Sequence, residues 1–241
     1  MTFPLLATQL TFNWPNTAST AREDFIVTPS NEKAFRMIDS WPQWPVHGIL
    51  LAGPEGSGKS HLARLWQEKS NARWLETLND LEEAFSSKPG GCFIIEIENT
   101  EDLAETPLFH LINRAILGEM FLLLTATLNL SFDSLQLRDL RSRLRVLPEV
   151  VLGPPDDILL RALLIKHFTD RQMNVAADVV DYMLTRIERT ALGVRRAVEI
   201  LDRLTLSEGR CLSKAIVARY LRRDVFLTLP QDKDPTLNFN S

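Results

Sequence analysis

The stretch GPEGSGKS, which runs from Gly53 to Ser60, matches the pattern G-x-x-x-x-G-K-S without a break. The apolar run ILLA comes before it and the helical pattern SHLARLW closes it, so the stretch lies where a strand passes into a helix. Glycine at Gly56 and Gly58 lets the backbone curl until its N–H groups point together, beside the positive end of the following helix. The stretch therefore predicts a phosphate-binding loop.

The residues of this loop have different expected tasks. Lys59 is expected to reach the outer phosphates of a nucleotide, and Ser60 to ligate Mg²⁺. The expected cofactors are ADP or ATP with Mg²⁺, and the sequence leaves open which nucleotide is resident. The predicted nucleotide contacts in this stretch are Gly53, Pro54, Glu55, Gly56, Ser57, Gly58, Lys59, Ser60 and His61.

Apolar runs with strand character recur on both sides of the loop. Several are apolar at successive positions, as strands covered on both faces must be, and helical patterns fall between them. This alternation predicts an α/β fold with a five-stranded parallel sheet. The expected strands are residues 46–52, 72–76, 92–97, 121–127 and 146–152, with helical patterns at 61–70, 78–85, 107–119 and 135–144.

After Gly153-Pro154-Pro155 the strand patterns stop and only helical patterns follow, which predicts a small all-helical lid. The lid helices are expected at residues 156–171, 177–189, 191–209 and 213–223. Both ends of the chain are rich in Thr, Asn, Asp and Pro, as tails are. The expected units are a tail at 1–22, a nucleotide-binding core at 23–153, the lid at 154–224 and a tail at 225–241.

Composition narrows the class of protein. A chain of 241 residues with 45% hydrophobic residues can bury one main hydrophobic core and a second, smaller one without disulfides. The two cysteines, Cys92 and Cys211, and the lack of any membrane-length apolar run predict a cytoplasmic protein without membrane contact. The net charge of -4 argues against a broad surface that coats nucleic acid, and the four histidines have no metal-ligand spacing.

The segment CFIIEIEN, residues 92–99, lies where phosphate-loop proteins usually place two adjacent acidic residues. Glu96 occupies the first position and is expected to coordinate Mg²⁺. The next residue, Ile97, can neither accept a proton nor orient an attacking water. Glu98 points to the opposite side of an extended strand unless the strand has already ended. We therefore expect weak or absent hydrolysis of the chain's own nucleotide.

Several motifs in their order along the chain resemble those of the AAA+ ATPases, and their details resemble the DnaA group of bacterial replication initiators. FIVTPSNEKAF at 25–35 is similar to that family's segment ahead of the phosphate loop. LRSRLR at 140–145 resembles the box that carries the arginine finger, and GVRRAVEIL at 193–201 resembles the lid motif with the sensor 2 arginine. The resemblance covers about residues 24–223 and implies an AAA+ P-loop core with a helical lid.

The resemblance assigns roles to single residues. Phe25 and Ile26 are implied to line the adenine pocket, and Thr127, at the end of FLLLTAT, to act as sensor 1. Arg195 is implied to bridge lid and phosphates from a helix that begins after Gly193. Arg143 is implied to act as an arginine finger in the ATP site of a neighbouring protein, and is the one expected catalytic residue.

The other arginines near this box have a structural interpretation. Arg138, Arg141 and Arg145 are expected to form a helix face paired with acids such as Asp139 and Glu149. An arginine finger stabilises charge on the phosphoryl group in transfer, so a protein that carries one promotes hydrolysis without performing it at its own site.

A DnaA-like core that lacks the initiators' helix-turn-helix domain resembles the family of regulatory inactivators of DnaA, the Hda or HdaA type. That family carries a short N-terminal motif that binds the replication sliding clamp, and TQLTFNW at 8–14 is similar to it. The implied partners are DnaA and the DNA polymerase III sliding clamp (beta subunit), without direct sequence-specific DNA binding, and a homo-oligomer is left open. The implied clamp contacts are Gln9, Leu10, Phe12 and Trp14.

The resemblance thus implies a negative regulator of replication initiation that binds the clamp and promotes hydrolysis of DnaA-bound ATP. Two alternatives stand beside it. One is an autonomous AAA+ ATPase such as a helicase loader, which requires a residue that positions the attacking water, and Ile97 argues against it. The other is a non-catalytic adaptor that joins the clamp to another replication protein.

Overall fold

The computed structural model describes residues 25–100, 103–128, 130–208 and 213–221. The sequence TQLTFNW at 8–14, with its predicted clamp contacts, lies outside these ranges, as do both predicted tails. Cys211 lies outside them too. Everything said of the structure below concerns the described residues.

Five parallel strands form one sheet, which confirms the predicted fold class. Their order across the sheet is β2-β3-β4-β1-β5, so β4 lies between the strand that leads into the phosphate loop and the strand that carries Glu96. The two edge strands are shorter than the sequence predicted. The strands are β1 (Gly48–Ala52), β2 (Arg73–Trp74), β3 (Cys92–Ile97), β4 (Phe121–Ala126) and β5 (Glu149–Val151).

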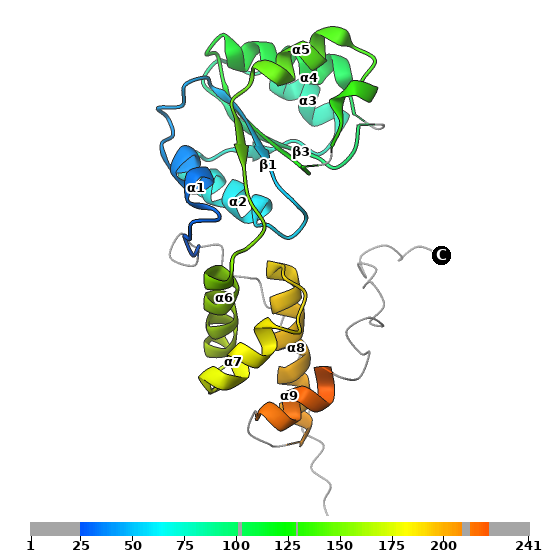
Figure 1. Cartoon of the computed structure of the whole chain (residues 1–241). Coiled ribbons are helices and arrows are strands. Elements are labelled where there is room, and N and C mark those ends of the chain that lie inside the picture. Colours follow the sequence, from blue (N-terminus) through cyan, green and yellow to red (C-terminus); the bar gives the residue numbers. More distant parts are fainter. Residues whose placement is uncertain (1–24, 101–102, 129, 209–212, 222–241) are drawn as a thin grey trace, which may run out of the picture.

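Helices cover both faces of the sheet (Figure 1). On one face, α1 (Glu32–Asp39) and α2 (Lys59–Ser70) share a hydrophobic cluster with β1, β3 and β4. On the other face, α3 (Leu78–Ser86), α4 (Glu105–Ile116) and α5 (Arg138–Val146) share a second cluster with the same strands. A short 3-10 turn at Phe132–Ser134 precedes α5. The helix α1 was not predicted from the sequence.

Aromatic packing holds α2 on its face of the sheet. Trp66 on α2 is almost fully buried, and its ring stacks on Trp44 with centroids 5.0 Å apart. Trp44 and Trp41 both meet Phe121 at the beginning of β4. This packing ties α2, which begins directly at the phosphate loop, to the centre of the sheet.

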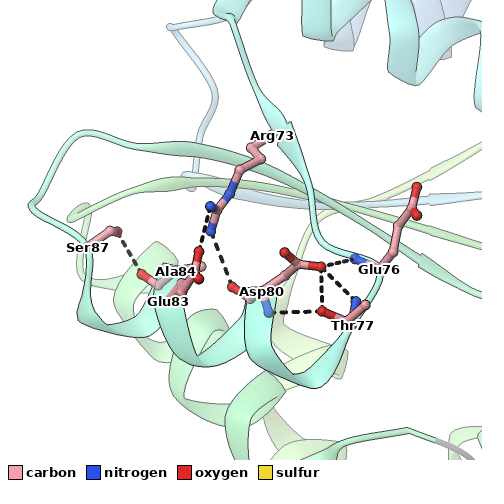
Figure 2. A network of polar contacts seen from close by, with 7 residues as sticks. All are labelled: Arg73, Glu76, Thr77, Asp80, Glu83, Ala84 and Ser87. Carbon is pink, nitrogen blue, oxygen red and sulfur yellow. Dashed lines mark hydrogen bonds and ion pairs between the residues drawn. The ribbon is translucent and has the colours of Figure 1, made fainter.

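The link between β2 and α3 is held by a polar network (Figure 2). Thr77 caps α3 by accepting from the backbone N–H of Asp80, and Asp80 accepts in return from the side chain and backbone of Thr77. These hydrogen bonds from Thr77 lower the pKa of Asp80. Arg73, on β2, reaches the carboxylate of Glu83 and the carbonyl of Asp80. The capping box therefore sets where α3 begins after the edge strand.

The helices after β5 form a separate bundle, drawn below the sheet in Figure 1. They bury a core of their own, to which Leu160, Phe168, Val180 and Leu201 contribute. This bundle is the predicted helical lid. None of the helices in the described part of the chain combines the length and apolar character that a membrane crossing requires. The lid helices are α6 (Asp157–Asp170), α7 (Ala177–Leu184), α8 (Ala191–Glu208) and α9 (Lys214–Leu221).

Candidate nucleotide site

The predicted phosphate loop connects the end of β1 to the first residue of α2. Gly56 and Gly58 have φ of 69° and 101°, in the left-handed region that favours glycine. Gly58 is also the N-cap of α2, and no side chain caps this helix end. A Cβ at Gly58 would meet nothing within 4 Å. There is therefore open space beside Gly58 at the positive end of α2, where no side chain caps the first N–H groups, and an anion site requires this.

Lys59 folds back into the loop. Its side chain is buried, with 9% of the residue exposed, and Nζ donates to the carbonyl oxygens of Gly53 at 2.9 Å and Pro54 at 3.0 Å. Burial lowers the pKa of Lys59, while the nearby carboxylates of Glu96 and Glu55 act in the opposite direction. The ammonium group is thus held inside the loop, beside the uncapped helix end.

The two predicted magnesium ligands come together across the sheet. Ser60, in the first turn of α2, donates from Oγ to Glu96 Oε1 at 3.5 Å, and both residues are exposed. Hydroxyl and carboxylate oxygens are hard ligands, and Mg²⁺ in nucleotide sites is usually held by one or two protein groups plus phosphates and water. The donor set of Ser60 and Glu96 therefore suits Mg²⁺ bound together with a nucleotide.

The residue after Glu96 turns away from this site. Ile97 is 2% exposed and packs in the cluster beneath α3, α4 and α5, on the face of the sheet opposite to α2. The strand β3 ends at Ile97, and Glu98 is exposed directly after it. The alternation of side chains along a strand therefore no longer applies at Glu98, which meets the condition under which it could serve the site.

Polar residues of β4 lie beside Glu96. Thr127, the predicted sensor 1, is the first residue after the strand and is half-buried at the edge where β3 also ends. Thr125, two residues earlier, is the direct neighbour of Glu96 in the sheet and is fully buried. Sequence reasoning missed Thr125. Its signal was a polar residue inside the apolar run FLLLTAT.

The predicted adenine-pocket residues gather at the start of α2. The ring of Phe25 stacks on Phe35 of α1 with centroids 5.4 Å apart and meets His61 edge to face at 5.2 Å. The carbonyl oxygen of Ile26 accepts from the side chain of Asn31 at 2.9 Å. Phe25 and His61 are thus brought together, and Ile26 is held by the N-cap residue of α1.

The lid reaches the phosphate loop through the beginning of α8. The backbone N–H of Ala191 donates to the carbonyl oxygen of Gly56 at 3.4 Å. A Cβ at Gly56 would lie 3.1 Å from the Cβ of Thr190, so the two residues are in close contact. Thr190 also accepts from the backbone N–H of Gly193 at 2.9 Å. Thr190 was missed, although a threonine directly before a helical pattern is a helix-start signal.

Arg195, the predicted sensor 2 residue, lies in the second turn of α8. The helix that carries it begins at Ala191, as the predicted range 191–209 has it, and so two residues before Gly193, whose N–H is satisfied by Thr190. The side chain of Arg195 donates from Nε to Glu199 at 2.8 Å, along its own helix. The contacts to the loop described above come from residues one turn earlier.

The arginines of α5 separate into paired and unpaired side chains. Arg145 forms an ion pair with Asp133 at 3.1 Å, and Arg141 donates to the carbonyl oxygen of Asp133 at 3.2 Å. The expected partners Asp139 and Glu149 are therefore corrected, since the 3-10 turn before α5 brings Asp133 closer. Arg143 is exposed and makes no hydrogen bond or ion pair within the described residues. In Figure 1, α5 lies at the end of the core away from the lid.

No protein-family model and no curated protein sequence matches the chain. The structure, however, is similar to domain III of the Thermotoga maritima replication initiation protein DnaA, with a TM-score of 0.66 and 17% identity over 84% of this chain and 95% of that one. It is similar to the Thermotoga maritima RuvB Holliday junction branch migration motor, with a TM-score of 0.62 and 19% identity over 83% and 70%.

A replication initiator DnaA bound to AMPPCP and single-stranded DNA gives a TM-score of 0.60, with 17% identity over 84% of this chain and 68% of that chain. The similarity to these structures extends over the sheet and the lid and concerns the fold. Together with the loop geometry, it shows that the chain has the AAA+ fold, a P-loop core followed by a helical lid.

Proposed function

We propose that this chain binds ADP or ATP with Mg²⁺ as a conformational ligand and promotes the hydrolysis of ATP bound to DnaA. The observation that carries the proposal is the position of Ile97. The chain has a formed phosphate loop with Ser60 and Glu96 at hydrogen-bond distance, but the next side chain is an isoleucine buried on the opposite face. A site of this kind suits binding better than hydrolysis, because the residue next to the metal ligand carries no group that orients water.

The nucleotide part of the proposal assigns distinct work to the residues of the loop. Lys59 and the first N–H groups of α2 bind phosphate oxygens, and Phe25 and His61 contact the base. Ser60 and Glu96 would hold Mg²⁺, which when bound neutralises charge on the outer phosphates. Because Thr190 and Ala191 touch the loop at Gly56, a nucleotide bound there is expected to order the lid against the core.

The regulatory part of the proposal rests on Arg143. An exposed guanidinium without a partner among the described residues is available to a second molecule, and Arg141 and Arg145 are not, because Asp133 engages both. A planar guanidinium placed on the transferring phosphoryl group can accelerate hydrolysis on the order of 10³- to 10⁵-fold. DnaA is the proposed acceptor, and its domain III shares this fold.

The proposed tether to the DNA polymerase III sliding clamp is TQLTFNW, within residues 1–22. We expect the double substitution Gln9→Ala and Leu10→Ala to weaken clamp binding by roughly 30-fold, the loss typical of an interface hot spot. The melting temperature should stay that of the parent protein, because residues 1–22 are expected to be a tail, and a tail contributes little to the core. Unchanged co-elution of the variant with the clamp would contradict the tether.

The decisive experiment measures phosphate release from ATP in three mixtures: this chain alone, DnaA alone, and both with the clamp loaded on DNA. The proposal expects slow release from the chain alone and fast release from the complete mixture. Clamp binding without faster hydrolysis would instead indicate the non-catalytic adaptor. Fast hydrolysis by the chain alone would indicate an autonomous ATPase.

One observation favours the autonomous ATPase as the second candidate. Because β3 ends at Ile97, Glu98 is exposed at the same edge of the sheet as Glu96 and could orient a water there. The substitution Glu98→Gln separates the two functions. If the chain alone hydrolyses ATP and Glu98→Gln abolishes it, the second candidate holds. Under the first, Glu98→Gln leaves stimulation of DnaA unchanged.

A further inference from the structure

Thr125 lies at the centre of the sheet, directly beside the carboxylate of the proposed magnesium site. It pairs in register with Leu51 of β1 on one side and with Glu96 of β3 on the other. Residues in register on neighbouring parallel strands direct their side chains to the same face. Leu51 belongs to the cluster beneath α1 and α2, so Thr125 and Glu96 both lie on the α2 face, where Ser60 begins.

The hydroxyl of Thr125 is buried without a partner. The residue is 0% exposed, and its Oγ1 makes no hydrogen bond within the described residues. An unsatisfied buried hydroxyl is destabilising, and a valine of the same shape would avoid this penalty. Of its two lateral neighbours, Leu51 offers no acceptor and Glu96 offers a carboxylate. The one acceptor beside this donor on the sheet is therefore the proposed metal ligand.

Glu96 itself is loosely held. Its only described hydrogen bond, from Ser60 Oγ, has a length of 3.5 Å, at the upper limit for such a bond. A glutamate has one more rotatable bond than the aspartate that is usual at this position, so its carboxylate needs a second contact to take one orientation. Metal-binding carboxylates are commonly oriented by such hydrogen bonds from neighbouring side chains.

We propose that, when Mg²⁺ and a nucleotide are bound, the Thr125 hydroxyl donates a hydrogen bond to Glu96 and holds its carboxylate in place for the metal. Thr125 is then a positioning residue and does not touch the metal. This inference rests on the proposed nucleotide site, but it concerns only the part of the affinity that depends on Mg²⁺. It also differs from the role predicted for Thr127, which lies beyond the strand end.

The test compares wild type, Thr125→Val and Thr125→Ser by calorimetric titration with AMPPCP, with and without Mg²⁺. Thr125→Val should lose affinity by about 10- to 100-fold when Mg²⁺ is present, the usual loss when such an orienting group is removed. Its affinity without Mg²⁺ should equal that of wild type. Thr125→Ser keeps the hydroxyl and should retain most of the Mg²⁺-dependent affinity.

A second measurement, on a double variant, tests whether Thr125 acts through Glu96. If the hydroxyl acts through that carboxylate, Thr125→Val should cause no further loss in a Glu96→Gln background, because residues that act together are not additive. Without nucleotide and Mg²⁺, the melting temperature of Thr125→Val should equal or exceed that of wild type, since the hydroxyl that is removed has no partner in that state.

Three outcomes would overturn the inference: equal Mg²⁺-dependent affinity in wild type and Thr125→Val, an equal loss with and without Mg²⁺, or no rescue by Thr125→Ser. A wild-type protein that binds no AMPPCP under either condition would overturn the proposed nucleotide site as well. The two failures are thus distinguished by the wild-type titration alone.

Discussion

The phosphate loop and the helix α5 carry the charged residues on which the proposed function depends, and they are built in opposite ways. At the loop, Lys59 is buried and donates to two carbonyl oxygens of its own chain. On α5, Arg143 is exposed and has no partner within the described residues. A charge enclosed by its own backbone is placed to hold a small ligand, and an exposed unpaired charge is placed to reach another molecule.

This difference implies that the two regions respond to substitution in different ways. An exposed side chain without contacts contributes little to the free energy of unfolding, so its removal should affect only a reaction with another protein. A buried cation inside a loop shapes that loop, so its removal should affect ligand binding first. The predictions below test whether the two regions separate in this manner.

The largest effect is expected for Arg143→Ala. Under the proposed function the guanidinium is needed only in the transition state shared with DnaA, so stimulated hydrolysis should fall by about 10³- to 10⁵-fold, equivalent to roughly 4 to 7 kcal/mol of barrier. Nucleotide affinity, melting temperature and clamp binding should remain those of wild type. Phosphate release from DnaA-bound ATP measures the first property, and calorimetry and thermal melting measure the others.

Two matched variants give the Arg143 prediction its control. Arg145→Ala removes an equally exposed arginine that is paired with Asp133, and it should stimulate DnaA like wild type. Arg143→Lys should not restore activity, since an ammonium lacks the planar fork that reaches two phosphate oxygens. If Arg143→Ala stimulated hydrolysis by DnaA as wild type does, the proposed difference between the phosphate loop and α5 would be wrong.

The second effect is expected for Lys59→Ala. Two charge-assisted hydrogen bonds to phosphate at roughly 1.5 to 3 kcal/mol each suggest a loss of nucleotide affinity of about 100-fold or more. Calorimetric titration with ADP measures it. The control is Lys69→Ala, at the far end of the same helix, where Lys69 pairs with Asp39 and affinity should persist. Equal affinity in Lys59→Ala and wild type would rule out the phosphate loop as the binding site.

A third effect is expected for Gly56→Ala, which tests the contact between loop and lid. The positive φ of Gly56 makes alanine unfavourable by about 1 to 2 kcal/mol, and the added Cβ would press on Thr190 at 3.1 Å. Gly90→Ala introduces the same kind of backbone strain in open space. Both variants should have a lower melting temperature than wild type, but only Gly56→Ala should lower nucleotide affinity. An equal loss of affinity in both would mean that the lid contact is unimportant.

The smallest effect is expected in the lid, at His167. Burial lowers the pKa of His167 below its ordinary 6.5, and the nearby charge of Arg171 adds to this. The unfolded chain therefore binds the proton more readily, and the free energy of unfolding should decrease as the pH falls below 6.5. His167→Gln should flatten this decrease without affecting nucleotide affinity above pH 6.5. Denaturant titrations at several pH values on both sides of 6.5 measure it.

The strands and the phosphate loop could be predicted from the sequence because the residues that determine each of them are adjacent along the chain. A run of buried apolar residues forms a central strand wherever neighbours cover both faces, and β3 and β4 match their predictions to within one residue. The edge strand β2 is only Arg73–Trp74, against a prediction of 72–76. An edge strand pairs on one side alone, so its length depends on its single neighbour and less on its own residues.

The helix α1 could not be predicted in the same way. It has eight residues, too few for a stable isolated helix, and it forms because Ala34 and Ile38 are buried against the sheet. Its start depends on Asn31, whose side chain accepts from the backbone N–H of Thr28. These contacts arise only once the sheet exists, and the short segment carries too little periodic signal of its own.

Charged pairs also differ in whether the sequence or only the folded structure reveals them. The pairing of Arg195 with Glu199 joins residues four apart on one helix, so the sequence contained that signal. The pairing of Arg145 with Asp133 crosses from a helix to the preceding turn and depends on how the chain folds between them. The neighbourhood of Thr125 and Glu96 required the order of the strands, which no local pattern contains.

The placement of β4 between β1 and β3 sets the distance between the two halves of the nucleotide site, the phosphate loop and Glu96. Neighbouring strands lie about 4.8 Å apart, so the strand that carries Glu96 stands roughly 10 Å from the one that leads into the loop. Glutamate is longer than aspartate by one methylene group, and bond rotation can compensate for this difference across such a distance. A slip of β3 by one residue would turn Glu96 to the other face. We therefore expect the chain to tolerate Glu96→Asp and to lose the site after any single-residue insertion within β3.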